Sequence, residues 1–217
     1  MNSIIIFVKY PTPGKVKTRL GAEIGYQAAA ELYHLFMALT FQLVQKAFSG
    51  NIFVACEPQE RLEDIKFLLP EKFHCFPQEG RDLGQRILHS IQYVVNCGAN
   101  KIVIIGSDSP TFPSHFIGDA FNRLDTRDLV LGPAQDGGYY LIGLKRAHRE
   151  LFETIPWSSS EVLQTTTNRA LEAGLTFSLL PEWYDVDGLN NLKRAANDDI
   201  SGKIKAYLQK YTKTLTP

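Results

Sequence analysis

IIIFVKYPTPGKVKTRL, residues 4–20, carries the clearest signal about the architecture of this chain. Its first five residues, Ile4–Val8, form an unbroken apolar run that is typical of a buried strand. Two prolines, a glycine and four cations follow, so the next loop is both stiff and positively charged. Because open α/β sheets bind ligands at the carboxyl ends of their strands, this loop predicts a site for a phosphate-bearing ligand. The alternative is a solvated surface loop, since Lys and Arg are mostly exposed.

The cations of this loop are the expected contacts of the phosphate groups. Ammonium and guanidinium groups both pair with phosphate oxygens, and Arg can do so through two parallel hydrogen bonds. A second glycine-bearing loop, Gly80–Arg86, adds two guanidinium groups just before a predicted helix. The residues predicted to bind phosphate are Lys9, Pro13, Gly14, Lys15, Lys17, Arg19 and Arg86.

Composition and charge are those of a globular α/β domain. The 217 residues include 44% hydrophobic and 21% charged side chains, and no break divides residues 1–217, so we expect a single domain. The formal net charge of zero argues against a nucleic-acid partner bound through a broad basic surface. No apolar run approaches the ~20 residues of a membrane span. The chain begins with a strand and not with a signal peptide, so we expect a cytoplasmic location.

Cysteines and histidines show neither a disulfide framework nor a zinc pattern. Cys56, Cys75 and Cys97 are odd in number and lack C-x-x-C spacing, which is typical of a reducing compartment. We expect all three to be small core residues. The five histidines are scattered along the chain without the spacing of metal ligands.

Strand-like and helix-like segments alternate along the chain. Strands are predicted over 4–8, 52–56, 73–76, 101–105, 129–131, 139–144 and 176–180, from continuous or alternating apolar runs. Helices are predicted over 27–48, 61–69, 85–96, 116–124, 159–173 and from 189 onward, from apolar residues three and four apart. This alternation predicts an α/β fold with a mostly parallel central sheet and helices on both of its faces.

A carboxylate follows the predicted central strand in Gly106-Ser107-Asp108-Ser109-Pro110. At the carboxyl end of that strand, Asp108 is placed to hold a hard divalent cation through its oxygens. The alternative is a turn or cap residue, a frequent role of Asp near Pro.

The loop Gly132–Tyr139, with sequence GPAQDGGY, joins two predicted strands. Asp136-Gly137 alone would make a hairpin turn, so the additional Gly132 and Gly138 indicate close approach of the backbone to a ligand or to another strand. Asp136 is then a candidate to bind the transferred group or to act as a general base.

Two further segments supply candidate site residues. In Asp185-Val186-Asp187-Gly188, the alternation places both carboxylates on one side of an extended chain, where one of them would complete a metal site with Asp108. Asp187 is also a candidate cap of the following helix. Trp157-Ser158 precedes another helix, and its hydroxyl is a candidate acceptor contact, although the serines there also fit an N-cap.

The order of these motifs resembles one family. KYPTPGKVKTRL (9–20), DLGQR (82–86), GSDSP (106–110), GPAQDGGY (132–139), WSSS (157–160) and DVDG (185–188) occur in register with its pattern. Over about residues 4–192 the chain resembles the DUF2064 group of bacterial glycosyltransferase-like proteins, within the nucleotide-diphospho-sugar transferase superfamily. Two departures stand out. The last motif lacks the usual D-x-D-T and acidic residue, which leaves Asn190 as a substitute, and no Asp-x-Asp follows the central strand.

The resemblance implies a Rossmann-like GT-A fold and a metal-dependent transferase. Asp108, Asp136 and Lys17 would be catalytic, and Asp108 and Asp187 would bind Mg²⁺ or Mn²⁺. The residues expected to line the donor and acceptor pocket are Gly137, Gly138, Tyr139, Trp157 and Ser158.

Two reactions and one binding function remain open from the sequence. The first is glycosyl transfer from a nucleotide-sugar to a small-molecule acceptor, which the family favours. The second is transfer of a nucleotidyl group from a nucleoside triphosphate to a phosphorylated small molecule, which the many cations of the first loop favour. The third is a ligand-binding protein without catalysis, against which the presence of Lys17, Asp108 and Asp136 argues.

Overall fold

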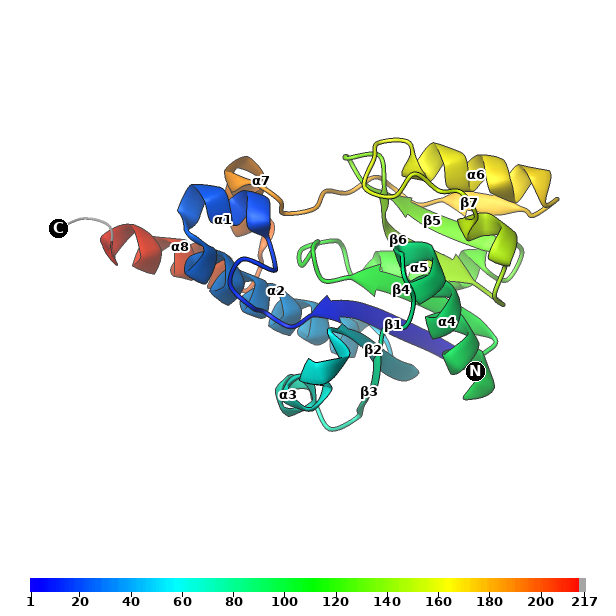
Figure 1. Ribbon diagram of the computed structural model, residues 1–217, viewed down its shortest axis with the longest axis horizontal. Helices are drawn as coiled ribbons and strands as arrows, with labels where there is room; N and C mark the ends of the chain where they lie inside the picture. The colour runs from blue at the N-terminus through cyan, green and yellow to red at the C-terminus, as the bar shows by residue number, and fades with distance from the viewer. Residues whose placement is uncertain (215–217) are drawn as a thin grey trace.

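The apolar run near the start of the chain becomes β1 (Asn2–Lys9), an inner strand of the sheet (Figure 1). The structure is a computed structural model that describes residues 1–214. Alternate side chains of β1 point to opposite faces of the sheet, so that Ile4 and Ile6 join one buried cluster and Ile5 joins the other. A strand buried on both faces needs this continuous apolar sequence.

Within residues 1–214 the sheet has seven strands, in the order β3-β2-β1-β4-β6-β5-β7. The other strands are β2 (Asn51–Glu57), β3 (Phe73–Pro77), β4 (Lys101–Gly106), β5 (Leu129–Pro133), β6 (Tyr139–Leu144) and β7 (Phe177–Leu179). Neighbouring strands run parallel except at β6, which is antiparallel to both β4 and β5. The prediction of a mostly parallel sheet is confirmed, and the exception is the strand that follows the glycine-rich loop.

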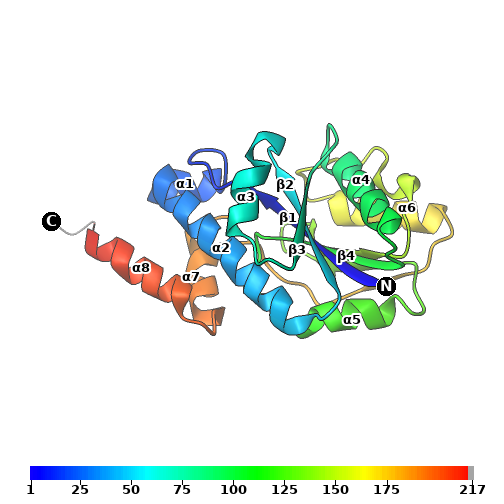
Figure 2. The same cartoon turned by 90° about the horizontal axis from the view of Figure 1, so that it is seen from below.

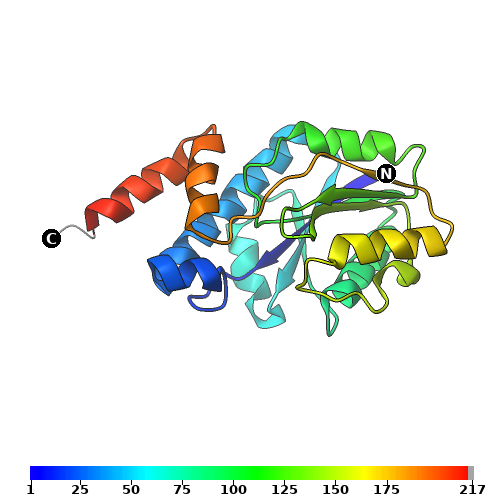
Figure 3. The same ribbon diagram turned by 90° about the horizontal axis from the view of Figure 1, so that it is seen from above.

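Helices cover both faces of the sheet (Figures 2 and 3). α2 (Tyr26–Ala47) and α5 (His115–Arg123) pack on the face that carries Ile4, whereas α4 (Leu83–Asn96) and α6 (Val162–Glu172) pack on the face that carries Ile5. The other helices are α1 (Thr18–Ile24), α3 (Leu62–Leu68), α7 (Leu189–Asp198) and α8 (Lys203–Thr214), with short 3₁₀ turns at Gln59–Arg61 and Arg149–Phe152. The predicted α/β class with helices on both faces is therefore confirmed.

Three predicted segments differ from the structure. The cationic loop is shorter than expected, because Thr18–Ile24 forms α1. The helix predicted over 159–173 begins only at Val162, and no side chain caps it. The helix predicted from residue 189 is broken into α7 and α8, because the Asp199 carboxylate binds the backbone N–H groups of Ser201 and Ile204 and turns the chain there.

The C-terminal helix α8 packs against α2. α8 extends away from the sheet in all three views (Figures 1–3). The Tyr207 hydroxyl on α8 donates to the Ala28 carbonyl on α2 at 3.2 Å, which anchors this extension. No helix within residues 1–214 combines the length and the apolar character needed to cross a bilayer.

The expectation that all three cysteines belong to the core holds only in part. Cys56 is fully buried on β2, and Cys75 on β3 is half-buried. Cys97 is exposed, because it follows the last turn of α4 in the connection to β4.

Two phenylalanines provide a matched test of this packing. Phe36 on α2 is fully buried against the sheet, whereas Phe67 on α3 is 88% exposed. We expect Phe36→Ala to lower the free energy of unfolding by about 3–5 kcal/mol, through lost burial and a cavity. Phe67→Ala should change it by no more than ~0.5 kcal/mol. Urea denaturation measures both, and equal effects would contradict the assignment of Phe36 to the core.

Candidate functional site

A cavity of about 630 Å³ opens where the carboxyl ends of β1, β2 and β4 meet. Several predicted site residues line it, from segments that are far apart in the sequence. They are Lys9, Lys15, Lys17, Arg19, Arg86, Asp108, Tyr139, Ser158 and Asp187. The predicted residues that do not line it are Pro13, Gly14, Asp136, Gly137, Gly138 and Trp157. The structure therefore brings most of the charged candidates together and leaves most of the glycine-rich loop outside.

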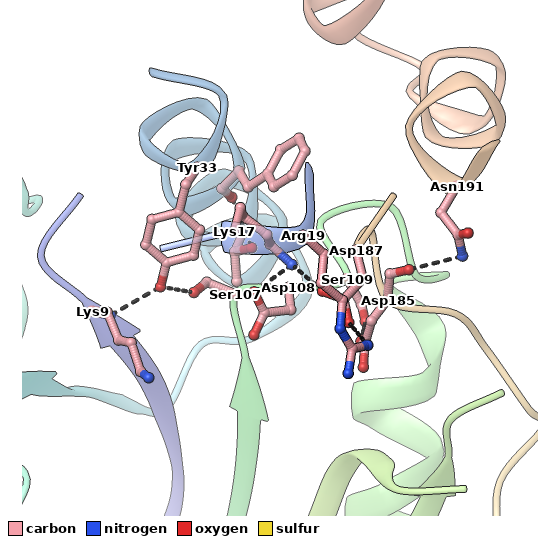
Figure 4. A network of polar contacts seen from close by, with 12 residues as sticks. Lys9, Lys17, Arg19, Tyr33, Ser107, Asp108, Ser109, Asp185, Asp187 and Asn191 are labelled. Carbon is pink, nitrogen blue, oxygen red and sulfur yellow. Dashed lines mark hydrogen bonds and ion pairs between the residues drawn. The ribbon is translucent and has the colours of Figure 1, made fainter. Parts of the chain in front are cut away.

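The Lys17 side chain is the centre of the site (Figure 4). It is only 3% exposed, and its Nζ lies 2.6 Å from Asp108 Oδ1 and 3.1 Å from Asp187 Oδ1. Burial lowers the pKa of this ammonium, but the charges of Asp108 and Asp187 outweigh burial and raise the pKa above its ordinary value. The two carboxylates therefore favour the charged form of Lys17 at the floor of the cavity.

The backbone of the first loop places this ammonium. Lys17 lies in the left-handed region, with φ of 45°, and directly precedes α1. Non-glycine residues adopt that conformation at a cost, which the surrounding structure must offset. Gly14 has φ of +74°, a conformation that favours glycine, and a Cβ there would meet open space.

Asp187 pairs with two cationic side chains and does not cap α7. Its Oδ2 lies 3.6 Å from Arg19 Nη1, while its Oδ1 faces Lys17. The first backbone N–H of α7, that of Leu189, donates instead to Glu23 Oε1 at 3.2 Å. Of the two roles that the sequence left open for Asp187, the structure favours the one within the site.

Asp185 lies deeper than Asp187 and has a different partner. The Ser109 hydroxyl donates to Asp185 Oδ1, and burial raises the pKa of this carboxyl to about 6. The segment is tied to the end of β4, because the Val186 N–H donates to the Asp108 carbonyl at 2.9 Å. The Asn191 side-chain amide donates a hydrogen bond to the Asp185 backbone carbonyl at 2.9 Å. Asn190, the expected substitute ligand, is exposed.

A buried hydroxyl pair behind Asp108 was not predicted from the sequence. The Tyr33 hydroxyl on α2 accepts from the Lys9 N–H at 2.9 Å and lies 2.7 Å from Ser107 Oγ. Ser107 Oγ also donates to the Phe7 carbonyl at 3.3 Å. These bonds join the ends of β1 and β4, and so they fix the backbone that carries Asp108 (Figure 4).

The glycine-rich loop is shaped by the chain itself. A Cβ on Gly137, which has φ of +90°, would lie 2.2 Å from the Ser160 carbonyl oxygen, and one on Gly132 would overlap the Tyr140 ring. The Asp136 carboxylate accepts from the Gly138 N–H at 2.9 Å and closes the turn. The close approach that the glycines indicated is thus to the protein's own backbone and side chains. The Asp136 carboxylate stabilises the turn in which it lies.

The segment before α6 contributes Ser158 to the cavity wall, with φ of 65°. Its neighbour Trp157 is half-buried and packs on the first turn of α4. A Cβ on Gly84 of α4 would lie 2.9 Å from the Trp157 ring, so glycine at that position makes room for the indole. Trp157 therefore joins α4 to the segment before α6.

Asp108 and Asp187 are the two carboxylates available to a hard divalent cation in this site. One oxygen of each pairs with Lys17 Nζ, at 2.6 and 3.1 Å, so a metal ion would bind on their cavity side, where both side chains are about half exposed. Mg²⁺ is commonly held by one or two carboxylates together with substrate phosphates. Within residues 1–214 no group of three or more His, Cys, Asp or Glu side chains could hold a metal, so the pair would depend on the substrate for further ligands.

Two polar residues at the other end of the cavity were also missed. Glu57 ends β2, and Gln78 directly follows β3. A polar residue within three positions of the end of a predicted strand was the signal that located Asp108. The same rule would have found Glu57, directly after strand 52–56, and Gln78, two residues after strand 73–76. Tyr33 had no such signal, because it lies on the apolar face of a long helix.

Comparisons with known proteins agree with this fold. The model of the DUF2064 family, described as uncharacterised proteins conserved in bacteria, matches residues 40–159. A crystal structure of a candidate nucleotide-diphospho-sugar transferase from Desulfovibrio desulfuricans G20 is 34% identical, with 97% of each chain covered and a TM-score of 0.86. No curated protein matches the sequence.

More distant structures share the fold alone. The inositol-1-phosphate CTP transferase from T. maritima has a TM-score of 0.63 at 15% identity, covering 94% of this chain and 96% of its own. The 4-diphosphocytidyl-2C-methyl-D-erythritol synthase from Anaerococcus prevotii DSM 20548 has a TM-score of 0.61 at 9% identity, covering 96% of both chains. With 34% identity over nearly its full length to the first of these structures, and the family model over more than half of it, this chain belongs to the DUF2064 family and has the fold of the nucleotide-diphospho-sugar transferases.

Proposed function

We propose that this protein is a transferase that takes a nucleotide-activated donor, and that it transfers a sugar from a nucleotide-sugar to a small-molecule acceptor. The observation that carries the proposal is the buried Lys17 ammonium between Asp108 and Asp187, at the floor of a cavity that Lys15 and Arg19 also line. A site with these charges suits a diphosphate. The similarity to a candidate nucleotide-diphospho-sugar transferase over 97% of the chain favours a nucleotide-sugar as the donor.

The cationic residues have the role of holding the diphosphate. Lys15 is exposed in the loop after β1, Lys17 ends that loop, and Arg19 follows in the first turn of α1. Charge that builds on the phosphate as the sugar leaves is stabilised by cations that are already in place. Mg²⁺ or Mn²⁺ held by Asp108 and Asp187 would add further neutralisation of the departing nucleoside diphosphate.

Acceptor binding falls to another part of the cavity wall. Tyr139 at the start of β6 and Ser158 before α6 line this part. In the reaction an acceptor oxygen bonds to the anomeric carbon, the bond from that carbon to the phosphate oxygen breaks, and the hydroxyl proton leaves the acceptor. Orienting the acceptor hydroxyl toward the donor is the contribution of this wall.

Nucleotidyl transfer is the second candidate, favoured by the number of cations that line the cavity. A triphosphate needs more positive charge than a diphosphate-sugar, and the cavity is lined by Lys9, Lys15, Lys17, Arg19 and Arg86. In that reaction an oxygen of a phosphorylated small molecule attacks the α-phosphorus, and pyrophosphate leaves.

The leaving group distinguishes the two reactions. We expect the purified protein with Mg²⁺ or Mn²⁺ to release a nucleoside diphosphate from one member of a panel of nucleotide-sugars, and no pyrophosphate from nucleoside triphosphates. Binding at about 100 times Kd would also stabilise the fold by roughly 2.7 kcal/mol in a thermal-shift assay. Release of pyrophosphate alone would replace the first reaction by the second. No stabilisation and no product across the whole panel would contradict both.

Asp108 is the residue whose loss should separate catalysis from folding. We expect Asp108→Asn to abolish metal-dependent turnover, because an amide is a poor ligand for a hard cation and carries no charge. The fold should persist, since Asp187 still pairs with Lys17. Turnover with and without EDTA and the unfolding temperature measure the two effects.

Asp119→Asn is the matched control for this variant. Asp119 is partly exposed on α5 and does not line the cavity, so the same change of one carboxylate to an amide should leave turnover unaltered. Unchanged turnover in Asp108→Asn would remove Asp108 from the mechanism.

A further inference from the structure

The end of the cavity away from Asp108 is built mainly from polar residues that have partners of their own. Strand order places β3 and β2 on the far side of β1 from β4. Lys9, Glu57 and Gln78 follow or end these three strands, and Arg86 reaches the same region from the first turn of α4. A nucleotide whose phosphates lie at Lys17 would extend its base toward this end.

Glu57 is held in place with one oxygen free. Arg86 Nη1 donates to Glu57 Oε2 at 2.5 Å, and Lys9 Nζ lies 3.9 Å from the same oxygen. The guanidinium is itself fixed, because Arg86 Nε donates to the Gly80 carbonyl at 3.2 Å. Glu57 Oε1 accepts no hydrogen bond from any residue in 1–214, and the side chain is 29% exposed. The cavity thus presents a fixed, negatively charged acceptor beside two cations.

Gln78 is oriented in a similar way. Both hydrogens of its amide are used, one on the Val8 carbonyl at 3.1 Å and one on the Ala55 carbonyl at 2.9 Å. The carbonyl of the amide is therefore the atom left for a ligand, and within residues 1–214 it accepts no bond. Glu57 and Gln78 together offer acceptors, while Lys9 and Arg86 offer donors.

Apolar side chains complete the walls of the same cavity. Phe7 on β1 and Leu83 and Ile87 on α4 line it. Leu83 and Ile87 are one turn apart, so they share the helix face on which Arg86 lies beside them. A flat ring with an apolar face and a polar edge matches this combination.

We propose that this subsite selects nucleotides whose base carries a ring N–H next to a carbonyl, namely guanine, uracil and thymine, and that Glu57 makes the selection. The inference rests on the proposed function, because it takes the ligand to be a nucleotide. The ring N–H donates to Glu57 Oε1, and the neighbouring carbonyl accepts from Arg86 or Lys9. Adenine and cytosine present a ring nitrogen acceptor beside an amine, so their lone pair would face the carboxylate.

The test is a calorimetric titration of the purified protein with GDP, UDP, CDP and ADP, each with Mg²⁺. We expect GDP or UDP to bind about tenfold or more tightly than CDP and ADP, the discrimination that a matched base-edge contact provides. In Glu57→Gln this preference should disappear, because an amide can donate as well as accept. The affinity for GDP or UDP should fall by about tenfold, with no fall for CDP and ADP.

The control variant is Glu60→Gln, which makes the same change of charge three residues later. Glu60 is exposed in the 3₁₀ turn after β2 and does not line the cavity, so the preference should remain. Equal binding of all four nucleotides to the wild-type protein would overturn the inference while leaving nucleotide binding intact. An equal loss for all four in Glu57→Gln would also overturn it, since it would assign Glu57 to the ribose hydroxyls. Binding of none of them would overturn the proposed function as well.

Discussion

The buried ion cluster at Lys17 is the interaction on which the rest of the site depends. An ammonium removed from water costs several kcal/mol unless charged partners surround it, so Lys17 requires Asp108 and Asp187. Two carboxylates that converge on one point repel each other in turn, and they require a cation between them. Lys17 and Asp187 are separated by 170 positions in the chain. One cluster therefore ties together the loop after β1, the end of β4 and the segment before α7.

The hydrogen bonds around this cluster make its position definite. The Tyr33 and Ser107 hydroxyls join the ends of β1 and β4, and the Val186 N–H binds the Asp108 carbonyl. Fully satisfied polar networks of this kind hold a backbone more rigidly than single bonds do. A site that stabilises charge at a reacting phosphate benefits from such rigidity, because its groups do not need to reorganise during the reaction. Burial and hydrogen bonding thus serve both the stability of the fold and the chemistry proposed for it.

The strand order divides the cavity into regions with different chemistry. β1 lies between β2 and β4. The residues at the carboxyl end of β4 and those at the carboxyl ends of β2 and β3 therefore meet above the carboxyl end of β1. On one side are Lys17, Asp108 and Asp187, with charges suited to phosphate and a divalent cation. On the other are Glu57 and Gln78, with acceptors fixed by their own hydrogen bonds. A nucleotide is a molecule with these two parts, a charged phosphate chain and a flat base with a polar edge.

Local patterns along the sequence were sufficient for the elements and for the edge of the sheet where the site lies. The apolar run at 4–8 and the alternation of helices and strands depend on neighbours only a few residues apart, and they predicted the sheet to within a few residues at most ends. The same rule placed Asp108 and the cations of the first loop at the carboxyl ends of strands. The glycine-rich loop shows where this reasoning stops. Gly137 packs closely against the Ser160 backbone, and no local pattern reveals which backbone will lie there.

The sequence by itself therefore determined the α/β class, the charge of the first loop and the edge of the sheet that carries the candidate site. Only the tertiary structure decided that Lys17, and not Lys15 or Arg19, is the buried cation, and that Tyr33, Glu57 and Gln78 belong to the site. The physical reason is the distance along the sequence over which each kind of interaction acts. Secondary structure and loop charge arise from nearby residues, whereas burial and ion pairing arise from strand order, which brings together groups up to 170 positions apart.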